Sequence, residues 1–266
     1  YKKHTLNRKE VIHIMKIICQ KINLLKSVNI SLKAVPSKTT MPILECILID
    51  ATANQIKFTT NDMELGIETI VEGSIEEKGM VALNAKIFYE IIRRLPDNDV
   101  TIKTDDKYTA TITCEKAKFN IPGKSGEDFA YLPMIERDDP LTISQYTLKN
   151  MIYQTIFSIA ANETNKLMTG ELFEIKNNCL KIVSLDGHRI AIRRMELKKD
   201  YSDRKVVVPG KTLNEISKIL SGEIDDLVNI YFSKNHILFE FDQTIVVSRL
   251  IEGEYFRIDQ MLSSDY

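Results

Sequence analysis

The hydrophobic and polar positions of this chain form long stretches with helical spacing and short stretches with a period of two. Residues 9–25 carry apolar side chains at helical spacing, which predicts a first helix capped by Thr5 or Asn7. Residues 85–95 predict a second helix, which Pro96 ends. Strands are expected around these helices at residues 43–49, 55–60, 64–72, 100–103, 108–114 and 118–121.

The second half of the chain follows the same order of elements. Two helices are predicted at residues 148–160 and 213–220. Prolines and charged residues gather at 130–140, so we expect one domain at residues 1–132 and another at residues 133–266. Strands are expected in this half at residues 171–176, 180–184, 188–197, 228–232, 237–241 and 244–250.

Three short motifs occur twice, and the two copies of each lie about 125 residues apart. This spacing is that of a whole domain, and it is far longer than the repeat of a solenoid. The sequence therefore predicts two copies of one α+β domain, each with an antiparallel sheet on one side and two helices on the other. The helices are then covered on one face only, which favours a built-up surface such as an arc or a ring over a single catalytic cleft. The repeated motifs pair residues 81–86 with 206–211, 61–64 with 185–188, and 126–129 with 253–256.

Composition narrows the class of protein. The 266 residues are 44% hydrophobic and 27% charged, as in ordinary globular proteins, and the net charge is −1. Binding to nucleic acid therefore requires local segregation of charge. The 4 cysteines include no CxxC pair and the 4 histidines have no metal-ligand spacing, so we expect reduced thiols, no metal and no cofactor. No stretch has the length of a membrane span and no signal peptide is found, so we expect a cytoplasmic protein without membrane contact.

The predicted helices carry polar stripes opposite their apolar faces, and acids are scarce in these stripes. Long cationic and amide side chains on helices can follow a phosphate backbone without reading bases. An ordinary amphipathic helix also has a charged outer face, and taken alone the stripes favour that simpler interpretation. The stripes contain His13, Lys16, Gln20 and Asn23; Lys86, Tyr89, Arg93 and Arg94; Lys149, Tyr153 and Gln154; and Lys211, Asn214 and Lys218.

Nothing in the sequence indicates a catalytic site. Two fragments imitate a phosphate-binding loop, at residues 123–125 and 210–212, but Lys118 and Lys205 stand where that loop requires a glycine. Asp186 and His188 suggest an acid–base pair, although a hairpin turn at this point explains them equally well.

Several segments, in this order and at these spacings, resemble the β subunit of bacterial DNA polymerase III, the sliding clamp. The resemblance covers essentially the whole chain and accounts for the internal repeat, because that family is built from successive copies of one clamp domain. The segments lie at residues 37–44, 60–64, 157–160, 185–191, 206–209 and 248–253.

The resemblance implies a DNA sliding clamp, a processivity factor without a reaction of its own. In the family, chains meet head to tail in a ring around duplex DNA, helices line the hole, and sheets form the rim. Lys38 matches a DNA-contacting position, and the loop after Ala160 also faces DNA. Together with the polar stripes this predicts a sequence-independent DNA surface of Lys38, Lys16, Gln20, Arg93, Lys149, Asn162, Lys166, Lys211 and Lys218.

The family also binds short peptides from the polymerase III α subunit, the clamp loader and other proteins with a clamp-binding motif. Its pocket uses the Asp-Gly-His-Arg turn and an apolar floor that suits inserted Leu or Phe side chains. The other interpretation is that Met168 and Ile190 are ordinary core residues. The resemblance maps this pocket onto Met168, Leu185, Gly187, His188, Arg189, Ile190, Gln260 and Met261.

The chain departs from the family pattern in its number of repeats. The family has three copies of the domain and this chain carries two, so a third is expected to be absent and self-association into a ring stays open. The alternative function is a two-domain interaction module that binds partner peptides without closing a ring on DNA. A more distant alternative is an enzyme that uses Asp186 and His188.

Overall fold

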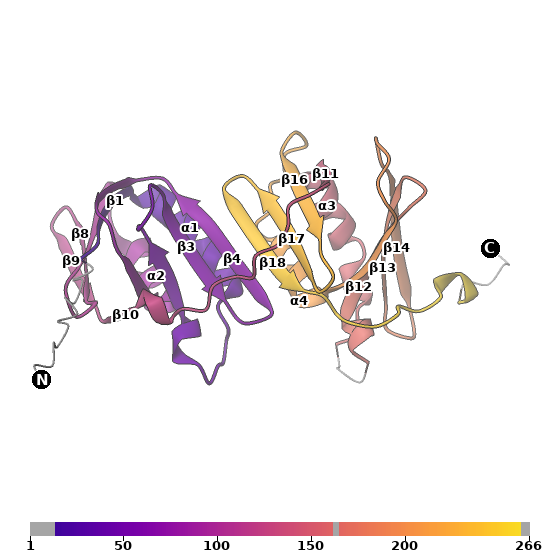
Figure 1. The fold of residues 1–266 in the computed structure, drawn as a ribbon, viewed down its shortest axis with the longest axis horizontal. Helices are drawn as coiled ribbons and strands as arrows, with labels where there is room; N and C mark the ends of the chain where they lie inside the picture. The colour runs from indigo at the N-terminus through magenta and orange to yellow at the C-terminus, as the bar shows by residue number, and fades with distance from the viewer. Residues whose placement is uncertain (1–13, 162–164, 262–266) are drawn as a thin grey trace, which may run out of the picture. The chain divides into compact units, whose positions relative to one another are not determined.

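The computed structural model describes residues 14–161 and 165–261 (Figure 1). The chain divides into two compact units. The first unit comprises residues up to 62 with 68–131, and the second comprises residues 63–67 with those from 132 onward.

The first unit contains two sheets and two helices. The helices α1 (Lys21–Ser31) and α2 (Ala85–Arg94) pack against each other. Helix α1 also packs on β3 (Ile56–Asn61), and α2 packs on β2 (Cys46–Asp50) and β6 (Met80–Asn84). Leu24, Val28, Phe88 and Ile92 point into the core that the helices share with the strands. One sheet has the order β5 (Ser74–Glu77), β1 (Lys16–Gln20), β7 (Asp99–Thr104), β8 (Ala110–Cys114) and β9 (Ala117–Ile121). The other runs β10 (Gly123–Ser125), β6 (Met80–Asn84), β2 (Cys46–Asp50), β3 (Ile56–Asn61) and β4 (Leu65–Val71), and the helices are α1 (Lys21–Ser31) and α2 (Ala85–Arg94).

The second unit has the same kinds of layers. Its helices α3 (Gln145–Tyr153) and α4 (Gly210–Ser217) pack together, and α4 also contacts β12 and β15. One sheet has the order β14 (Ile190–Glu196), β13 (Cys179–Leu185), β12 (Gly170–Lys176) and β15 (Arg204–Pro209). The other strands are β18 (Thr244–Arg249), β17 (His236–Phe241), β16 (Leu227–Phe232) and β11 (Leu141–Ser144), and short 3₁₀ turns are η1 (Leu32–Ala34), η2 (Pro42–Glu45), η3 (Gly126–Asp128), η4 (Ile156–Ser158), η5 (Lys166–Thr169) and η6 (Ile258–Gln260).

The predicted α+β class is confirmed. Neighbouring strands run antiparallel, as the pairs β1–β7, β2–β6 and β12–β15 illustrate. The pairing registers also show which positions of the two units correspond. Ile47 faces Leu83 across β2 and β6, and Glu171 faces Val208 across β12 and β15, so Ile47 and Glu171 are equivalent positions.

The helix predicted at residues 9–25 is wrong. Residues 16–20 form β1, in which Ile17 and Cys19 are buried with the period of two that defines a strand. The helix begins at Lys21, and Ile22, expected to face inward, is 70% exposed. The proposed caps Thr5 and Asn7 lie outside the described residues.

Other bounds differ for local reasons. The helix predicted at 148–160 ends at Tyr153, because the Thr155 hydroxyl bonds back to the carbonyls of Met151 and Ile152 and a 3₁₀ turn follows. The strand expected at 43–49 begins only at Cys46, since Pro42 opens the turn η2. The prediction placed no strand at β1, β5, β6, β10, β11 and β15; the remaining elements occur within a few residues of the predicted bounds.

Glu171 is an acid in the core of the second unit. Its side chain is 0% exposed, and neither carboxylate oxygen has a hydrogen-bond partner in the structure. Burial raises the pKa of Glu171 to about 8. The nearby Thr155 hydroxyl offsets this pKa shift only in part, because it donates to the Met151 and Ile152 carbonyls at the end of the preceding helix. The folded protein therefore holds this carboxyl in its neutral form at pH 7.

We expect Glu171→Gln to change how stability depends on pH. The unfolded chain loses this proton near the ordinary pKa of 4.5, whereas the folded protein keeps it up to about pH 8. The contribution of this group to the free energy of unfolding is therefore complete below pH 4.5 and is lost as the pH rises toward 8. The loss is at most about 1.4 kcal/mol for each pH unit. Urea unfolding at pH 5 to 8 should show that the stability of the glutamine variant increases relative to that of the parent protein as the pH rises.

The matched control is Glu174→Gln on the same strand, where the carboxylate pairs with Lys181 at 2.5 Å. This variant should show no such gain. A difference between Glu171→Gln and the parent that stays constant across this pH range contradicts the prediction.

Candidate functional site

Helix α2 presents a basic face because its apolar face is buried. Asn84 caps the helix by accepting a hydrogen bond from the Ile87 amide at 3.1 Å. Arg93 and Arg94 on the outer face share the Glu90 carboxylate, at 2.7 and 3.1 Å. The hydrogen bond from Arg93 lowers the pKa of Glu90, so the acid stays ionised and moderates the positive charge of this face.

The helices of the second unit carry fewer available cations than expected. Lys211 and Lys218 are exposed on or beside α4, and Lys218 pairs with Glu215 at 2.6 Å. Lys149 is half-buried, and its ammonium donates to the Leu220 carbonyl at 3.0 Å. Lys149 therefore holds the chain after α4, a role that the sequence pattern did not indicate.

The basic stripe predicted for the first helix changes with the position of that helix. Lys16 lies on β1, where its ammonium pairs with Glu76 at 2.5 Å, and Gln20 precedes α1. The prediction that both lie on a helix face is therefore wrong. The exposed face of α1 instead includes Lys26 and Asn29, which sequence reasoning missed. The spacing of the buried Leu24, Ser27, Val28 and Ser31 was the available signal, because it marks the inward side of a helix over residues 21–31.

Two basic loop residues of the predicted DNA surface are exposed. Lys38 lies in the segment between η1 and η2, and Lys166 is the first residue of η5. Asn162 lies outside the described residues.

The Asp186–Arg189 segment is a hairpin turn between β13 and β14. The Asp186 carboxylate accepts hydrogen bonds from the amides of His188 and Arg189, at 3.1 and 3.2 Å, and pairs with the Arg189 Nε at 2.9 Å. Gly187 has a φ of 89°, which glycine adopts without strain. The His188 amide and then Arg189 lower the pKa of Asp186, so this acid serves the turn and the acid–base interpretation loses its support.

An apolar cluster lies beside this turn. It brings together Met168, Leu185 and Ile190 with Tyr255 and Ile258. Leu185 is buried, whereas Met168 and Ile190 are only half-buried, so their surfaces remain partly available. The predicted apolar pocket residues thus meet in one place, and Tyr255 is an addition that sequence reasoning missed.

The arginine of the turn has an aromatic partner. The Arg189 guanidinium carbon lies 5.8 Å from the ring centre of Phe157, which is 57% exposed. Gln260 and Met261 are exposed at the end of η6, the turn that contributes Ile258 to the cluster. The turn, the cluster and Phe157 together form a half-open apolar surface with a fixed cation at its edge.

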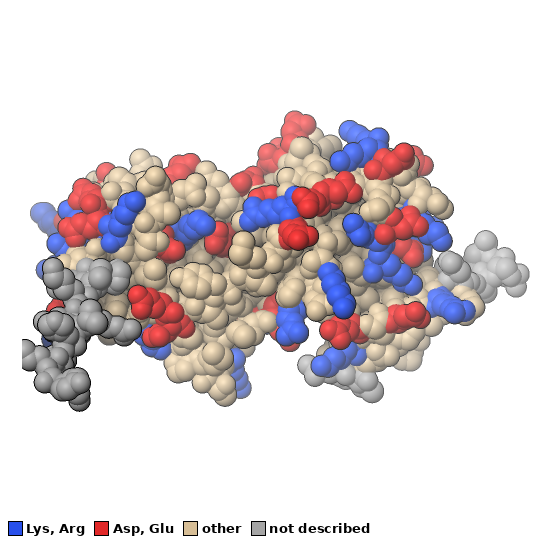
Figure 2. Space-filling model, viewed as in Figure 1, with Lys and Arg blue, Asp and Glu red and all other residues tan. Residues whose placement is uncertain are grey.

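Charge on the molecular surface is mixed. On the face seen in Figure 2, lysine and arginine side chains alternate with acidic ones, and neither sign covers it alone. Within the described ranges no group of three or more His, Cys, Asp or Glu side chains is placed to hold a metal ion. No helix of the described residues has the length and hydrophobicity to cross a membrane.

Comparison with known proteins identifies related chains. The family described as DNA polymerase III beta subunit, N-terminal domain, matches residues 15–133, and its central domain matches residues 142–256. A putative DNA polymerase III beta subunit from Eubacterium rectale ATCC 33656 has a similar structure, with a TM-score of 0.93 and 68% identity over 95% of this chain and 69% of that chain. The sliding clamp of Bacillus subtilis has a TM-score of 0.91 and 34% identity over 95% of this chain and 68% of that one.

A curated relative, the beta sliding clamp of Staphylococcus epidermidis, is 33% identical over 250 residues, which are 91% of this chain. The aligned part is 66% of the length of that relative, so the chain spans slightly less than two thirds of it.

Proposed function

The chain belongs to the DNA polymerase III β subunit family, and from this premise we propose that it acts as a DNA sliding clamp. In this role it surrounds duplex DNA together with further copies and holds the replicative polymerase on its template. It performs no reaction itself and works in the cytoplasm. Residues 1–132 form its first clamp domain and residues 133–266 its second.

The observation that carries this proposal is the pair of helices in each unit, with cations on their outer faces. Arg93 and Arg94 share Glu90, and Lys218 pairs with Glu215, so these three cations each have an acid beside them. Such pairs weaken the attraction for phosphates without removing it. Weak contacts to the backbone, without reading of bases, are what a protein that slides along DNA requires.

The second part of the proposal concerns protein partners. The half-open cluster around Met168, Leu185 and Ile190 suits inserted Leu or Phe side chains of the polymerase III α subunit, the clamp loader and other clamp-binding proteins. Arg189, fixed by Asp186 and Phe157, borders that surface and is available to peptide carbonyls.

The alternative is an interaction module that binds such peptides without encircling DNA. Retention on closed circular DNA and loss on linearisation support the clamp, because only a topological link depends on free DNA ends. Peptide binding with equal retention on both DNA forms favours the module.

We expect the chain to associate with other copies through β9. This strand is an edge of its sheet, and its Phe119 is 41% exposed. Light scattering over a concentration series should give an average mass that rises with concentration and falls for Phe119→Asp. Lys198→Asp, at an exposed lysine outside β9, is the control and should behave as the parent does. A parent that stays monomeric at every concentration contradicts this prediction.

We expect Lys26→Glu combined with Lys86→Glu to weaken DNA association at low salt by about tenfold or more, since two phosphate contacts become repulsive. The slope of log K against log salt should fall by about two. Fluorescence anisotropy with a labelled duplex measures both quantities.

The control carries the same charge change at two exposed lysines after β14, as Lys198→Glu with Lys199→Glu. Equal loss of affinity in both double variants shows a general charge effect and counts against the helix surface.

We expect Arg189→Ala to weaken the binding of a Leu- and Phe-containing clamp-binding peptide of a polymerase III α subunit by about tenfold, because the cation at the edge of the apolar surface is lost. His188→Ala should weaken the binding of the same peptide. Isothermal calorimetry gives the affinities, and Lys198→Ala, an exposed change outside the turn, is the control. Unchanged affinity in both turn variants removes this site from the proposal.

A further inference from the structure

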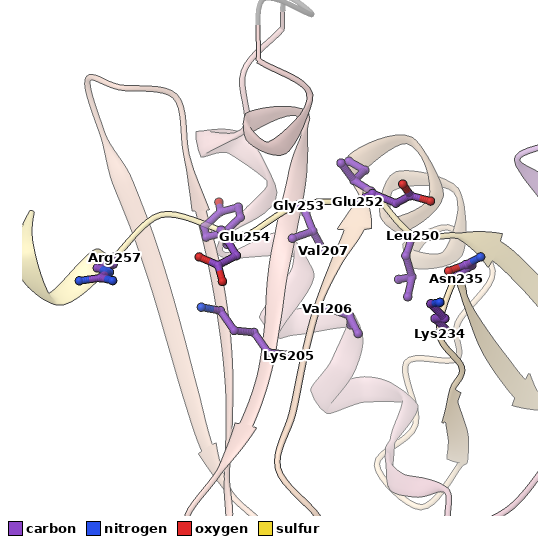
Figure 3. A pocket seen from close by; sticks show the side chains of 12 residues that line it. Lys205, Val206, Val207, Lys234, Asn235, Leu250, Glu252, Gly253, Glu254 and Arg257 are labelled. Atoms are coloured by element: carbon purple, nitrogen blue, oxygen red, sulfur yellow. The ribbon is translucent and has the colours of Figure 1, made fainter.

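A groove in the second unit lies outside the Asp186–Arg189 turn and shares Tyr255 with the cluster described above (Figure 3). Its cavity has a volume of about 610 Å³ and lies between β15, the turn after β16, and residues 250–257. Val206, Val207 and Leu250 contribute apolar surface, while Lys205, Lys234 and Arg257 contribute charge. A second cavity of about 240 Å³ also includes Lys205 and Arg257, so the two hollows adjoin along the same segment. No residue predicted for the peptide pocket lines the larger cavity, whereas Gln260 lines the smaller one.

The groove opens onto the edge of a sheet. β15 is the last strand of its four-stranded sheet and pairs with β12 on one side. On the other side Val207 accepts a hydrogen bond from the Ile251 amide at 2.9 Å, as an isolated bridge. Backbone groups in an antiparallel strand turn to alternate sides. The amide and carbonyl of Lys205, two residues before Val207, therefore face the open edge inside the groove.

In the first unit a strand covers the adjoining positions of the equivalent edge, where Gly123 to Ser125 of β10 pair with Leu83, Ala82 and Val81 of β6. Met80 faces Asp50 across β6 and β2, as Lys205 faces Glu174 across β15 and β12, so Met80 and Lys205 are equivalent. The Met80 side chain packs so tightly on Gly126 that an added Cβ there meets its sulfur at 2.8 Å. A methionine therefore fills in one unit the space that a lysine leaves open in the other.

The charges of the groove favour an acidic occupant. In Figure 3 the side chains of Lys205 and Glu254 point toward one another in its middle. Lys234 lies toward one end of the groove and Arg257 toward the other, and both are exposed. Glu252 is the other acid of the lining. Carboxylates two residues before and after an apolar residue in an extended peptide match this order of cation, apolar floor and cation.

We propose that this groove binds an extended, acidic peptide segment of a partner protein, which adds as a strand to the edge of β15. Backbone hydrogen bonds to Lys205 give affinity, and carboxylates that meet Lys234 and Arg257 give selectivity. The site goes beyond the proposed function, because it is a second peptide surface that neither DNA association nor the Asp186–Arg189 turn requires.

The test uses the full chain and the blocked peptide acetyl-Thr-Glu-Thr-Val-Thr-Glu-Thr-amide as the probe. Its Glu, Val and Glu side chains share one face of an extended strand. Amide NMR titration should shift Lys205, Val206 and Lys234, and Lys205→Met should weaken binding by about tenfold or more because it fills the groove as Met80 does. Lys198→Met is the matched control, at an exposed lysine outside the groove, and should bind as the parent does.

Two further peptides separate the parts of the proposal. A version with Lys in place of both Glu residues should not bind, and a version N-methylated at the residues that face β15 should lose its affinity. Binding of the methylated peptide equal to that of the probe overturns strand addition. Absence of amide shifts with the probe, or equal affinity in Lys205→Met and the parent, overturns the site. All of these outcomes are independent of whether the chain encircles DNA.

Discussion

Each unit depends on one constraint, which is that its two helices have strands on one side only. Leu24, Val28, Phe88 and Ile92 give the first pair of helices its buried side, and burial of such side chains stabilises the unit by about 1.5–3 kcal/mol for each. Once these residues are inside, the helical period fixes Lys26, Lys86 and Arg94 on the opposite side. The basic surface is therefore a consequence of core packing, and it needs no loop to hold it in place.

The same constraint explains why the net charge is uninformative. A chain with a charge of −1 keeps cations on its helix faces by placing most of its acids elsewhere and a few beside the cations. Asp186 is another acid that lies beside a cation and has two structural roles. Its carboxylate binds two backbone amides and Arg189, so one acid both forms the turn and fixes the cation that borders the apolar cluster.

The sequence was most informative where the periodicity was long and its ends were marked. Asn84 and Pro96 enclose α2, and its predicted bounds were nearly those observed. The helix predicted at the start of the chain is wrong because Met15, Ile18 and Ile22 fit a helical period by chance. The buried residues there are Met15, Ile17 and Cys19, which have the period of a strand. β15 is not predicted because Val206, Val207 and Val208 are consecutive apolar residues without alternation, and β10 has only three residues. The sequence does not predict the role of Lys149, because only tertiary packing brings its ammonium to the Leu220 carbonyl.

The internal repeat gives each position of one unit an equivalent in the other, so that differences between the two units stand out. Ile47 and Glu171 occupy equivalent positions, and both are fully buried, so the shared fold requires no acid there. Met80 and Lys205 are likewise equivalent, and there the fold tolerates both a filled and an open groove. A buried acid without a partner reduces stability, and an open strand edge invites aggregation. At the two equivalent positions the first unit has a buried isoleucine and a packed methionine, so these positions, rather than the shared helix faces, distinguish the second unit from the first.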